Sequence, residues 1–499
     1  AKCRRSFDVR LYLHGHNYKY AAEQMMLSLY PAERPEYPEG RPEGDRVELS
    51  LSQGARFVTA SCKLVSHGRT YRGRSAVRAD SITDGISRDK LCSRIIKNAF
   101  YRAALSSGHG KPVWGALTGV RPGKLFCSLM ENSDANEALK RFISDYDVSR
   151  ERAELCRDTS LVTQQVRTSL GEKDACLYVG IPFCPTRCSY CSFVSQSVEK
   201  SMKLIPPFLD ALMLEIDAAA KAVNELGLSV ISIYMGGGTP TTLSPEQLGR
   251  LCSRLSERFD LSRLREYTVE AGRPDTITGA KLQVLKSHGV DRVSVNPQTM
   301  RDDVLEAIGR RHTAQDICDA LGKVRGVGGM AVNMDLIAGL TSDSVEGFAA
   351  TLDMVTKLEP ENITVHTLSL KKGSRITLEG SALPTAAEVG RMLDIAGDKL
   401  RAAGYFPYYL YRQKFMSGGF ENVGWTKAGG VNLYNVCIME ELCSIIALGG
   451  GGSTKLVSRD GGHSIRLFAP KYPAEYIAGI DKTCGNKQGI INFYNKETK

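Results

Sequence analysis

The chain has 499 residues, of which 42% are hydrophobic and 24% are charged. This composition is ordinary for a globular protein and excludes both a disordered chain and a bundle of membrane helices. Lys and Arg residues number 65 against 55 Asp and Glu residues, a net charge of +10. Because no dense basic tract accompanies this excess, it fits an anionic small ligand and argues against a nucleic-acid partner.

The sequence contains no run of about 18 apolar residues, so we expect no membrane span. The first residues, AKCRRSFDVR, show no apolar leader, and we expect a cytoplasmic protein. Fourteen cysteines are spread along the chain. They are too sparse for a secreted disulfide scaffold, so free thiols in a reducing compartment are expected.

Residues 1–165 predict a small α+β extension. Strand-like alternation covers residues 7–13, 46–52 and 57–64,. A segment rich in Pro, Glu and Gly at 31–45 predicts an exposed loop, and helical periodicity follows at 89–105 and 136–142,. No motif in this region carries a recognisable chemistry.

From residue 170 to 400, short apolar runs alternate with amphipathic helical stretches. The predicted strands are residues 177–181, 230–235, 267–270, 292–296, 331–336 and 363–368. The predicted helices are residues 207–226, 245–259, 278–288, 314–324 and 345–358. This alternation predicts an α/β fold with right-handed βαβ units and a parallel sheet. Six units are too few for a closed eight-fold barrel, so we expect an open partial barrel with its ligand at the carboxyl ends of the strands.

After residue 400 the alternation stops. Residues 401–499 are rich in Tyr, Asn and Gly as far as position 452, and the next helical signal comes at 473–480. We expect a third, C-terminal domain that covers one side of the barrel.

Three cysteines directly follow the first predicted core strand. Cys184, Cys188 and Cys191 have the spacing C-x3-C-x2-C in GIPFCPTRCSYCSF. Thiolates at this spacing favour a [4Fe–4S] cluster with one iron left open for a substrate or cofactor. The alternatives are a zinc site or three unrelated cysteines. Zinc needs a fourth ligand, and the local candidate Cys176 is expected at the opposite end of the strand.

A glycine run ends the second predicted strand. Residues 235–240 read MGGGTP, and glycines without Cβ atoms let a backbone approach a ligand closely. The alternative is a tight turn with no ligand role. Its place at a strand end in the same sheet as the cysteine loop favours the ligand.

Together, the cysteine motif and the glycine run resemble the radical S-adenosylmethionine (AdoMet, SAM) superfamily. Within it, the chain is similar to the oxygen-independent coproporphyrinogen III oxidases, also called coproporphyrinogen dehydrogenases, in their HemZ-like branch. The segments that carry this resemblance are YVGIPFCPTRCSYCSF, WGALTGVRPGK, YYLYRQKFMSGGFENVGW and IMEELCSIIALGGG. It implies a partial (β/α)6 radical SAM barrel at 170–400 and a HemN-like, coproporphyrinogen-oxidase-like domain at 401–499.

The resemblance also implies the site residues. Cys184, Cys188 and Cys191 would bind a [4Fe–4S] cluster whose open iron is chelated by AdoMet. The positions that match the family's AdoMet contacts are Tyr178, Gly237, Gly238, Thr239, Glu270, Gln298, Arg310 and Asp335.

Several of these positions also have a direct physical interpretation. Strand-end carboxylates such as Glu270 and Asp335 suit ribose hydroxyls or an amino group, and the alternative is that they pair with structural arginines. Arg310 can bind a carboxylate through two parallel hydrogen bonds. Arg311 is adjacent to Arg310, and the sequence leaves open which of the two arginines faces inward. For Gln298, the alternative is a turn residue.

The reaction implied is the conversion of coproporphyrinogen III to protoporphyrinogen IX in porphyrin and haem biosynthesis. The family's well-characterised dehydrogenases carry a further cysteine where this chain has Phe193. Haem chaperones of the same family also have Phe there, but their His-Asn pair corresponds to Tyr434-Asn435 here. The alternatives are therefore a haem-delivering chaperone and a radical SAM tetrapyrrole methyltransferase. For the enzyme, the expected partners are a tetrapyrrole and a reductant protein such as flavodoxin or ferredoxin.

Overall fold

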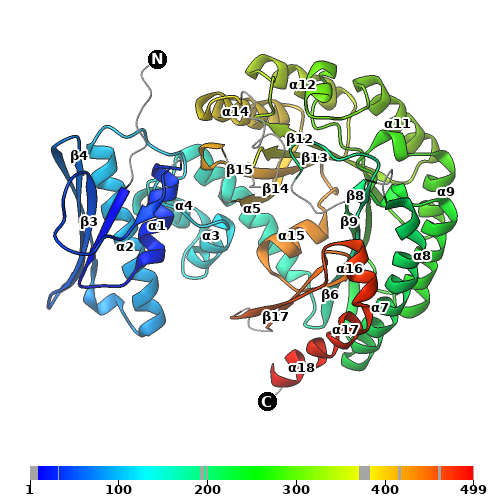
Figure 1. The fold of residues 1–499 in the computed structure, drawn as a ribbon, viewed down its shortest axis with the longest axis horizontal. Coiled ribbons are helices and arrows are strands. Elements are labelled where there is room, and N and C mark those ends of the chain that lie inside the picture. Colours follow the sequence, from blue (N-terminus) through cyan, green and yellow to red (C-terminus); the bar gives the residue numbers. More distant parts are fainter. Residues whose placement is uncertain are drawn as a thin grey trace. The chain divides into compact units, whose positions relative to one another are not determined.

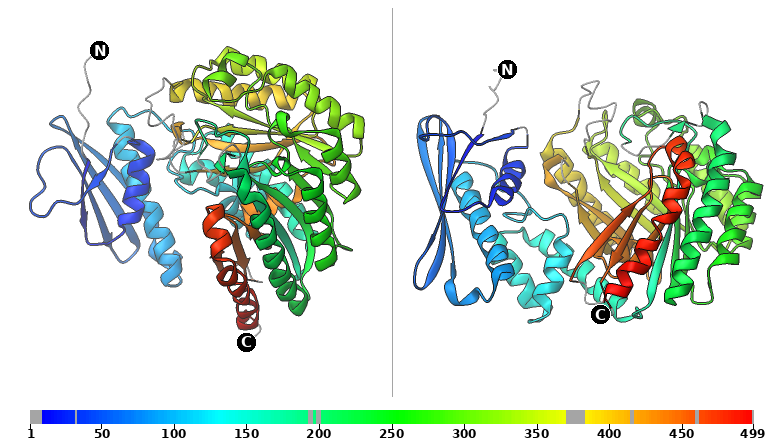
Figure 2. Two further views of the ribbon diagram at one scale, coloured as in Figure 1. Left: turned by 45° about the vertical axis from the view of Figure 1, so that its right-hand side comes forward. Right: turned by 60° about the horizontal axis from the view of Figure 1, so that its bottom comes forward.

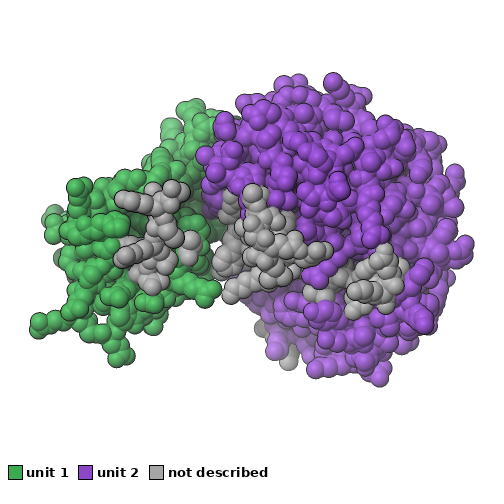
Figure 3. Space-filling view, turned by 45° about the horizontal axis from the view of Figure 1, so that its top comes forward, with its two compact units in different colours: residues 1–157 green, residues 158–499 purple. Residues whose placement is uncertain are grey.

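The computed structural model describes residues 9–31, 33–191, 196–197, 201–369, 383–413, 417–458 and 462–497. Phe193 lies outside the described residues. The chain divides into two compact units, Ala1–Arg157 and Asp158–Lys499, which Figure 3 shows in green and purple. The expected separation of residues 170–400 from 401–499 as two domains stays a prediction.

The N-terminal unit has the expected α+β architecture. Its sheet has the order β2-β1-β3-β4-β5, in which β3, β4 and β5 are antiparallel neighbours and β1 runs parallel to β2 and β3. The strands are β1 (Val9–His14), β2 (Pro35–Glu36), β3 (Arg46–Gln53), β4 (Phe57–Ser66) and β5 (Arg69–Arg78). The helices are α1 (Lys19–Leu29), α2 (Gly85–Ser106), α3 (Pro122–Met130) and α4 (Ala135–Tyr146). Sequence patterns predicted β1, β3, β4, α2 and α4, but missed β5, α1 and α3.

Helix α2 packs closely on this sheet because β5 carries a glycine. A Cβ atom on Gly73 would lie 2.0 Å from the backbone oxygen of Ala99 and 2.5 Å from the nitrogen of Ala103. Any side chain at position 73 would therefore push the helix away from the sheet. Buried apolar residues from β3, β4, α1 and α2 form the core at this contact.

Six parallel strands form the centre of the second unit, as the alternating pattern predicted. They are β6 (Asp174–Ile181), β9 (Ser229–Gly237), β10 (Glu266–Glu270), β11 (Arg292–Ser294), β12 (Ala331–Ala338) and β13 (Asn362–Thr367). Figures 1 and 2 show a curved sheet with helices along its outer face. The helices of the core are α5 (Arg150–Thr168), α7 (Ile205–Leu226), α8 (Pro245–Arg258), α9 (Gly279–Ser287), α10 (Asp302–Ala307), α11 (Ala314–Val327), α12 (Val345–Lys357) and α14 (Ala386–Ala402). The partial (β/α)6 barrel is confirmed.

Local signals set the ends of the outer helices. Ser244 caps α8 and forms a reciprocal capping box with Gln247,. Thr313 caps α11 through a capping box of the same kind within its own helix,. Helix α7 begins with prolines in its first turn and ends at Gly227 in the left-handed conformation,. These three helices are therefore delimited by their own sequence and need the sheet mainly for the burial of their apolar faces.

Residues after 402 extend the sheet at both edges, which corrects the expectation that they cover one side of the barrel. At one edge, β15 (Glu421–Thr426) runs antiparallel to β13 and pairs with β14 (Phe406–Arg412). At the other edge, β16 (Ser444–Gly449) lies parallel to β6 and is followed by the antiparallel strands β17 (Ser453–Val457) and β18 (Ser464–Phe468). The remaining elements are the helices α15 (Leu433–Glu440), α16 (Pro473–Ala478), α17 (Ile480–Gly485) and α18 (Gln488–Glu497). Within the described ranges, every helix is too short or too polar to cross a bilayer.

A buried ion pair holds the C-terminal helices to α7. Glu215 of α7 is fully buried, and Lys487 lies 2.7 Å from its carboxylate. The same carboxylate accepts hydrogen bonds from the Tyr476 hydroxyl and, at 2.7 Å, from the backbone N–H of Gly449. Lys487 also donates to the backbone oxygen of Ala447. The network therefore joins α7, the end of β16, α16 and the segment before α18.

Candidate functional site

The predicted site residues lie in the carboxyl-terminal halves of the parallel strands or in the segments that follow them, except Arg310, which follows helix α10. Tyr178 belongs to β6, Gly237 to β9, Glu270 to β10 and Asp335 to β12. Gln298 follows β11 and bonds through its backbone N–H to the carbonyl of Asp335 at 2.9 Å. Because parallel strands end at the same edge of their sheet, side chains far apart in sequence come together there.

The first part of the cysteine loop is held against the glycine run. Cys184 ends the two-residue strand β7 (Phe183–Cys184), which pairs with β8 (Gln196–Ser197). The backbone N–H groups of Gly238 and Thr239 donate to the carbonyls of Ile181 and Phe183, at 2.8 and 2.7 Å. A Cβ atom on Gly238 would lie 2.5 Å from the Phe183 oxygen. Close packing against the cysteine loop is thus one reason for this glycine, while its contact with AdoMet stays a prediction.

Two arginines flank the second cysteine. Cys188 is buried, and its Sγ accepts a hydrogen bond from Nη1 of Arg273 at 3.2 Å. The other terminal nitrogen of Arg273 donates to Thr186 in the same loop. Arg310 donates to the Tyr190 hydroxyl at 3.0 Å and to the carbonyl oxygens of Gly272 and Asn296. Burial alone would lower the pKa of the Arg310 guanidinium, but the neighbouring Tyr190 and Cys188 outweigh it and raise that pKa.

The donors around these sulfurs suit an iron–sulfur cluster. The Thr239 hydroxyl lies 3.6 Å from Sγ of Cys184 and donates to it, as Arg273 does to Cys188. Cys191 is partly buried and donates its backbone N–H to the carbonyl of Cys188 at 3.2 Å. Soft thiolates with nearby O–H and N–H donors are the ligand set that such clusters use. The chemistry of this loop therefore fits a [4Fe–4S] group.

Glu270 presents a carboxyl group whose protonation changes near neutral pH. Its Oε1 accepts a hydrogen bond from the Tyr234 hydroxyl at 2.7 Å. Burial raises the pKa of Glu270 to about 7, and the negative charge of Asp335 acts in the same direction. A bound cationic group at this edge would stabilise the ionised form.

Asp335 is held ionised by a set of polar neighbours. Asn296 and Asn333 each donate a side-chain N–H to its carboxylate at 2.8 Å. His366 of β13 lies 3.8 Å from Oδ2. Burial opposes the charge, but His366 and the hydrogen bonds outweigh it and lower the pKa of Asp335. The site thus places one ionised and one readily protonated carboxyl on the same strand edge.

The backbone of Gln298 is strained. Its φ is 68°, a left-handed conformation that residues other than glycine rarely adopt,. Its carbonyl accepts from the N–H of Ile337 at 3.0 Å. This bridge to β12 fixes Gln298 at the end of β11, as expected for either a turn residue or a cofactor contact.

Three stacked tyrosines form one wall of this region. The rings of Tyr234 and Tyr434 are 4.5 Å apart, and Tyr178 stacks on both at 6.4 and 6.3 Å. Burial raises the pKa of all three phenols, so they are neutral at physiological pH. Tyr434 comes from α15, so the C-terminal region contributes directly to the wall.

A buried histidine lies beside the two arginines. His312 is 5% exposed, and neither of its ring nitrogens has a hydrogen-bond partner among the described residues. Burial, together with the charges of Arg310 and Arg273, lowers the pKa of His312 to about 3. A neutral imidazole therefore lies beside the guanidinium groups that border Cys188.

Sequence reasoning missed part of this arrangement. Arg273 lies three residues after the strand-end Glu270, and His366 interrupts an apolar strand. Both were visible signals of polar groups at the sheet edge. Nothing in the sequence indicated that Tyr434 would stack on Tyr234, because this contact depends on the position of α15.

Comparisons with known proteins relate the chain to a family. Residues 178–355 match the model of the radical SAM superfamily. The chain is 38% identical over 466 residues to the oxygen-independent coproporphyrinogen-III oxidase-like protein HemZ of Bacillus subtilis, covering 91% of each. It is 30% identical to the haem chaperone HemW of the same organism, over 49% of this chain and 64% of that protein. It is also 32% identical to the oxygen-independent coproporphyrinogen III oxidase of Salmonella typhimurium, over 47% of this chain and 51% of that protein.

Among solved structures, the coproporphyrinogen III oxidase HemN of Escherichia coli has a similar fold. The TM-score is 0.52 at 23% identity, over 65% of this chain and 73% of that one. At this identity the likeness concerns the fold alone.

Proposed function

Since the chain belongs to the HemZ-like branch of the radical SAM oxygen-independent coproporphyrinogen III oxidase family, we propose that it converts coproporphyrinogen III to protoporphyrinogen IX without oxygen. The family uses a [4Fe–4S] cluster and AdoMet. The observation that supports the proposal is the shared strand edge: the cysteine loop follows β6, and the carboxyl groups of Glu270 and Asp335 lie on β10 and β12 of the same parallel sheet. Such an edge can hold a cluster beside a charged organic cofactor.

In this proposal, Cys184, Cys188 and Cys191 hold the cluster. When bound, the cluster and AdoMet together supply a 5′-deoxyadenosyl radical, which starts the loss of carbon dioxide from a propionate. The Arg273 guanidinium and the Thr239 hydroxyl donate to the sulfurs and offset their negative charge,.

The remaining predicted residues would bind and orient AdoMet. Glu270 and Asp335 offer acceptors for its amino group and ribose hydroxyls. Arg310 is fixed by two backbone carbonyls and Tyr190, so its guanidinium is already oriented toward the cysteine loop. The stack of Tyr178, Tyr234 and Tyr434 excludes water from one side, which protects a radical from side reactions.

An anaerobic assay tests this function. Reconstituted protein is reduced with flavodoxin, supplied with AdoMet and coproporphyrinogen III, and analysed for protoporphyrin (after oxidation) and 5′-deoxyadenosine. We expect both products in a fixed ratio, with none from the Cys188→Ala variant. Deoxyadenosine at an unchanged background rate, with no vinyl product, would refute the decarboxylase. A product carrying an added methyl mass would instead identify a methyltransferase.

A second candidate is a haem chaperone, which the 30% identity to HemW favours. Tyr434 and Asn435 stand where that branch carries a His-Asn pair, and Tyr434 is a buried phenol in the tyrosine stack. A tyrosine can ligate haem iron, as in catalase. Titration with haem gives the test: a Soret band that is lost in Tyr434→Phe, without substrate-dependent deoxyadenosine, supports this candidate.

A further inference from the structure

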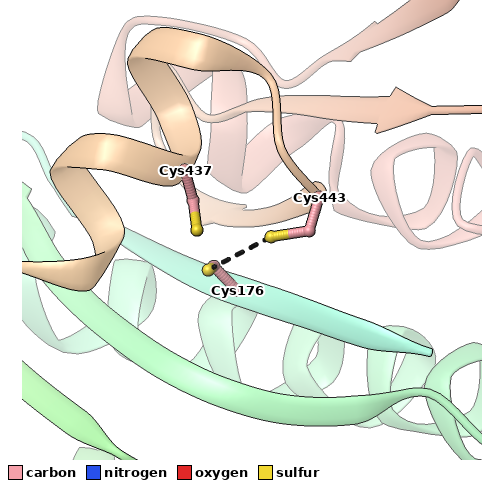
Figure 4. A group of neighbouring side chains, drawn as sticks. All are labelled: Cys176, Cys437 and Cys443. Atoms are coloured by element: carbon pink, nitrogen blue, oxygen red, sulfur yellow. Dashed lines mark hydrogen bonds between the residues drawn. The ribbon is translucent and has the colours of Figure 1, made fainter. Parts of the chain in front are cut away.

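A second group of cysteines converges outside the C-x3-C-x2-C loop. Cys176 lies near the start of β6, Cys437 in α15, and Cys443 immediately before β16 (Figure 4). Figure 4 shows the three sulfurs turned toward one another. The Sγ atoms of Cys176 and Cys443 are 3.7 Å apart, and all three sulfurs lie within 4.8 Å of one another. The sequence placed Cys176 away from the cysteine loop, but did not show that it joins Cys437 and Cys443.

The separations match those around a single metal ion. Metal–thiolate bonds of about 2.3 Å place two sulfurs on one ion about 3.8 Å apart in tetrahedral geometry and about 4.0 Å apart in trigonal geometry. The 3.7 Å between Cys176 and Cys443 matches these distances, and the other two separations do not exceed 4.8 Å. Within the described parts of the chain, this is the sole set of three or more His, Cys, Asp or Glu ligand atoms that lie so close together.

The surroundings bury the three cysteines almost completely. Cys176 and Cys437 have no exposed surface, and Cys443 is 8% exposed. The walls are apolar and include Val162, Ile231 and Val436. Such a pocket excludes competing water and oxygen ligands, and it favours soft sulfur–metal bonding over hard cations.

The electrostatics favour a cation at this point. Two buried acidic side chains lie near the sulfurs: Asp174, two residues before Cys176 on β6, and Glu266, whose carboxylate lies 3.6 Å from Arg292. Oδ1 of Asp174 is buried without a hydrogen bond, and its nearest cation, Arg263, is 3.7 Å away. A buried carboxylate oxygen without a hydrogen bond is better accommodated with a positive ion in this apolar pocket than without one.

We propose that Cys176, Cys437 and Cys443 bind one soft, thiophilic d¹⁰ metal ion, separate from the cluster at Cys184, Cys188 and Cys191. Three sulfurs without a fourth side-chain ligand favour trigonal Cu(I) over Zn²⁺, which takes four ligands in structural sites. The ion would join β6 to α15 and the start of β16. It would thereby fix Tyr434, which precedes Cys437 by one helical turn and forms part of the tyrosine wall.

The test measures metal content in full-length protein that already carries its iron–sulfur cluster. Under anaerobic conditions, Cu(I) or Zn²⁺ is supplied at one equivalent, and loosely held ions are removed by a competing chelator. We expect about one Cu or Zn per chain in the wild type, and at least a tenfold loss in Cys437→Ser. Cys252→Ser is the matched control, because Cys252 is an equally buried cysteine outside the group.

Two further readouts guard against a folding defect. Iron and sulfide content should be unchanged in Cys437→Ser, Cys443→Ala and the control, since the cluster ligands are intact. X-ray absorption at the bound metal should show three sulfur neighbours at about 2.3 Å. Retention of neither ion by the wild type, or equal retention by Cys437→Ser, would overturn the proposal. These outcomes do not depend on decarboxylase activity, so they are independent of the proposed function.

Discussion

Glu270 should make the protein less stable as the pH rises, and its removal should reverse this effect. Burial raises the pKa of its carboxyl to about 7 from an ordinary value of 4.5. The folded protein therefore binds this proton more tightly than the unfolded chain does. The stability that protonation provides is fully present below about pH 4.5, falls between pH 4.5 and 7, and is lost above pH 7,.

The size of the effect follows from the two pKa values. The pKa of Glu270 rises from an ordinary 4.5 to about 7 in the folded protein. At about 1.4 kcal/mol per pH unit, this rise corresponds to roughly 3 kcal/mol in the free energy of unfolding. In Glu270→Gln the side chain is neutral at every pH and can still accept from Tyr234. The variant should thus come within about 1 kcal/mol of the wild type near pH 5 and exceed its stability by roughly 3 kcal/mol near pH 8, or about 4 °C in melting temperature.

The predicted pH dependence is checked by thermal unfolding from about pH 5 to about pH 8.5. The wild type and the variant are compared without cluster and AdoMet. Glu225→Gln provides the control, since Glu225 is an exposed carboxylate on α7, and its difference from the wild type should not vary with pH. A Glu270→Gln difference that is constant with pH, or that grows toward acid pH, would show that the carboxyl is not protonated near neutrality in the folded protein.

Three other changes should have distinct effects. Glu215→Leu leaves Lys487 buried without its partner and should cost about 3–5 kcal/mol, whereas the double variant with Lys487→Met should recover most of this loss in thermal unfolding. Arg273→Met removes the cationic donor to Cys188. It should lower the reduction potential of the cluster by roughly 50–100 mV in an anaerobic redox titration, with unchanged iron content. An unaltered potential would show that Arg273 does not donate to the cluster ligand. Gly238→Ala forces a Cβ against the Phe183 carbonyl and should weaken AdoMet binding at least tenfold, as measured by calorimetry. Binding as tight as in the wild type would show that the loop relaxes without cost.

The barrel could be predicted from sequence because its signals are local. Each parallel strand is a short, mainly apolar run, and most outer helices have their own amphipathic pattern and caps. Strand β5 was missed because residues 69–78, RTYRGRSAVR, contain few apolar residues. Its strand conformation comes from pairing with β4 along its whole length, which a local pattern does not indicate.

Most of the predicted site residues lie on or just after parallel strands, whose carboxyl ends meet at one edge of the sheet; their role in AdoMet binding stays a prediction. The contacts that could not be predicted are those of the C-terminal region. Tyr434 reaches Tyr234, and Cys437 and Cys443 reach Cys176, because β16 inserts parallel to β6. That pairing joins segments about 270 residues apart, and no periodicity in either segment specifies its partner.

The insertion of β16 beside β6 also affects how the chain is made. One edge of β6, the first strand of the barrel, stays unpaired until the ribosome has produced a segment 267 residues further on. At about 5–20 residues per second, this interval lasts roughly 13–50 s. During that time a strand with almost entirely buried residues exposes its open hydrogen-bonding edge, a state prone to intermolecular pairing. Nascent chains of this protein should therefore depend on chaperones most strongly while residues 182–443 are being synthesised.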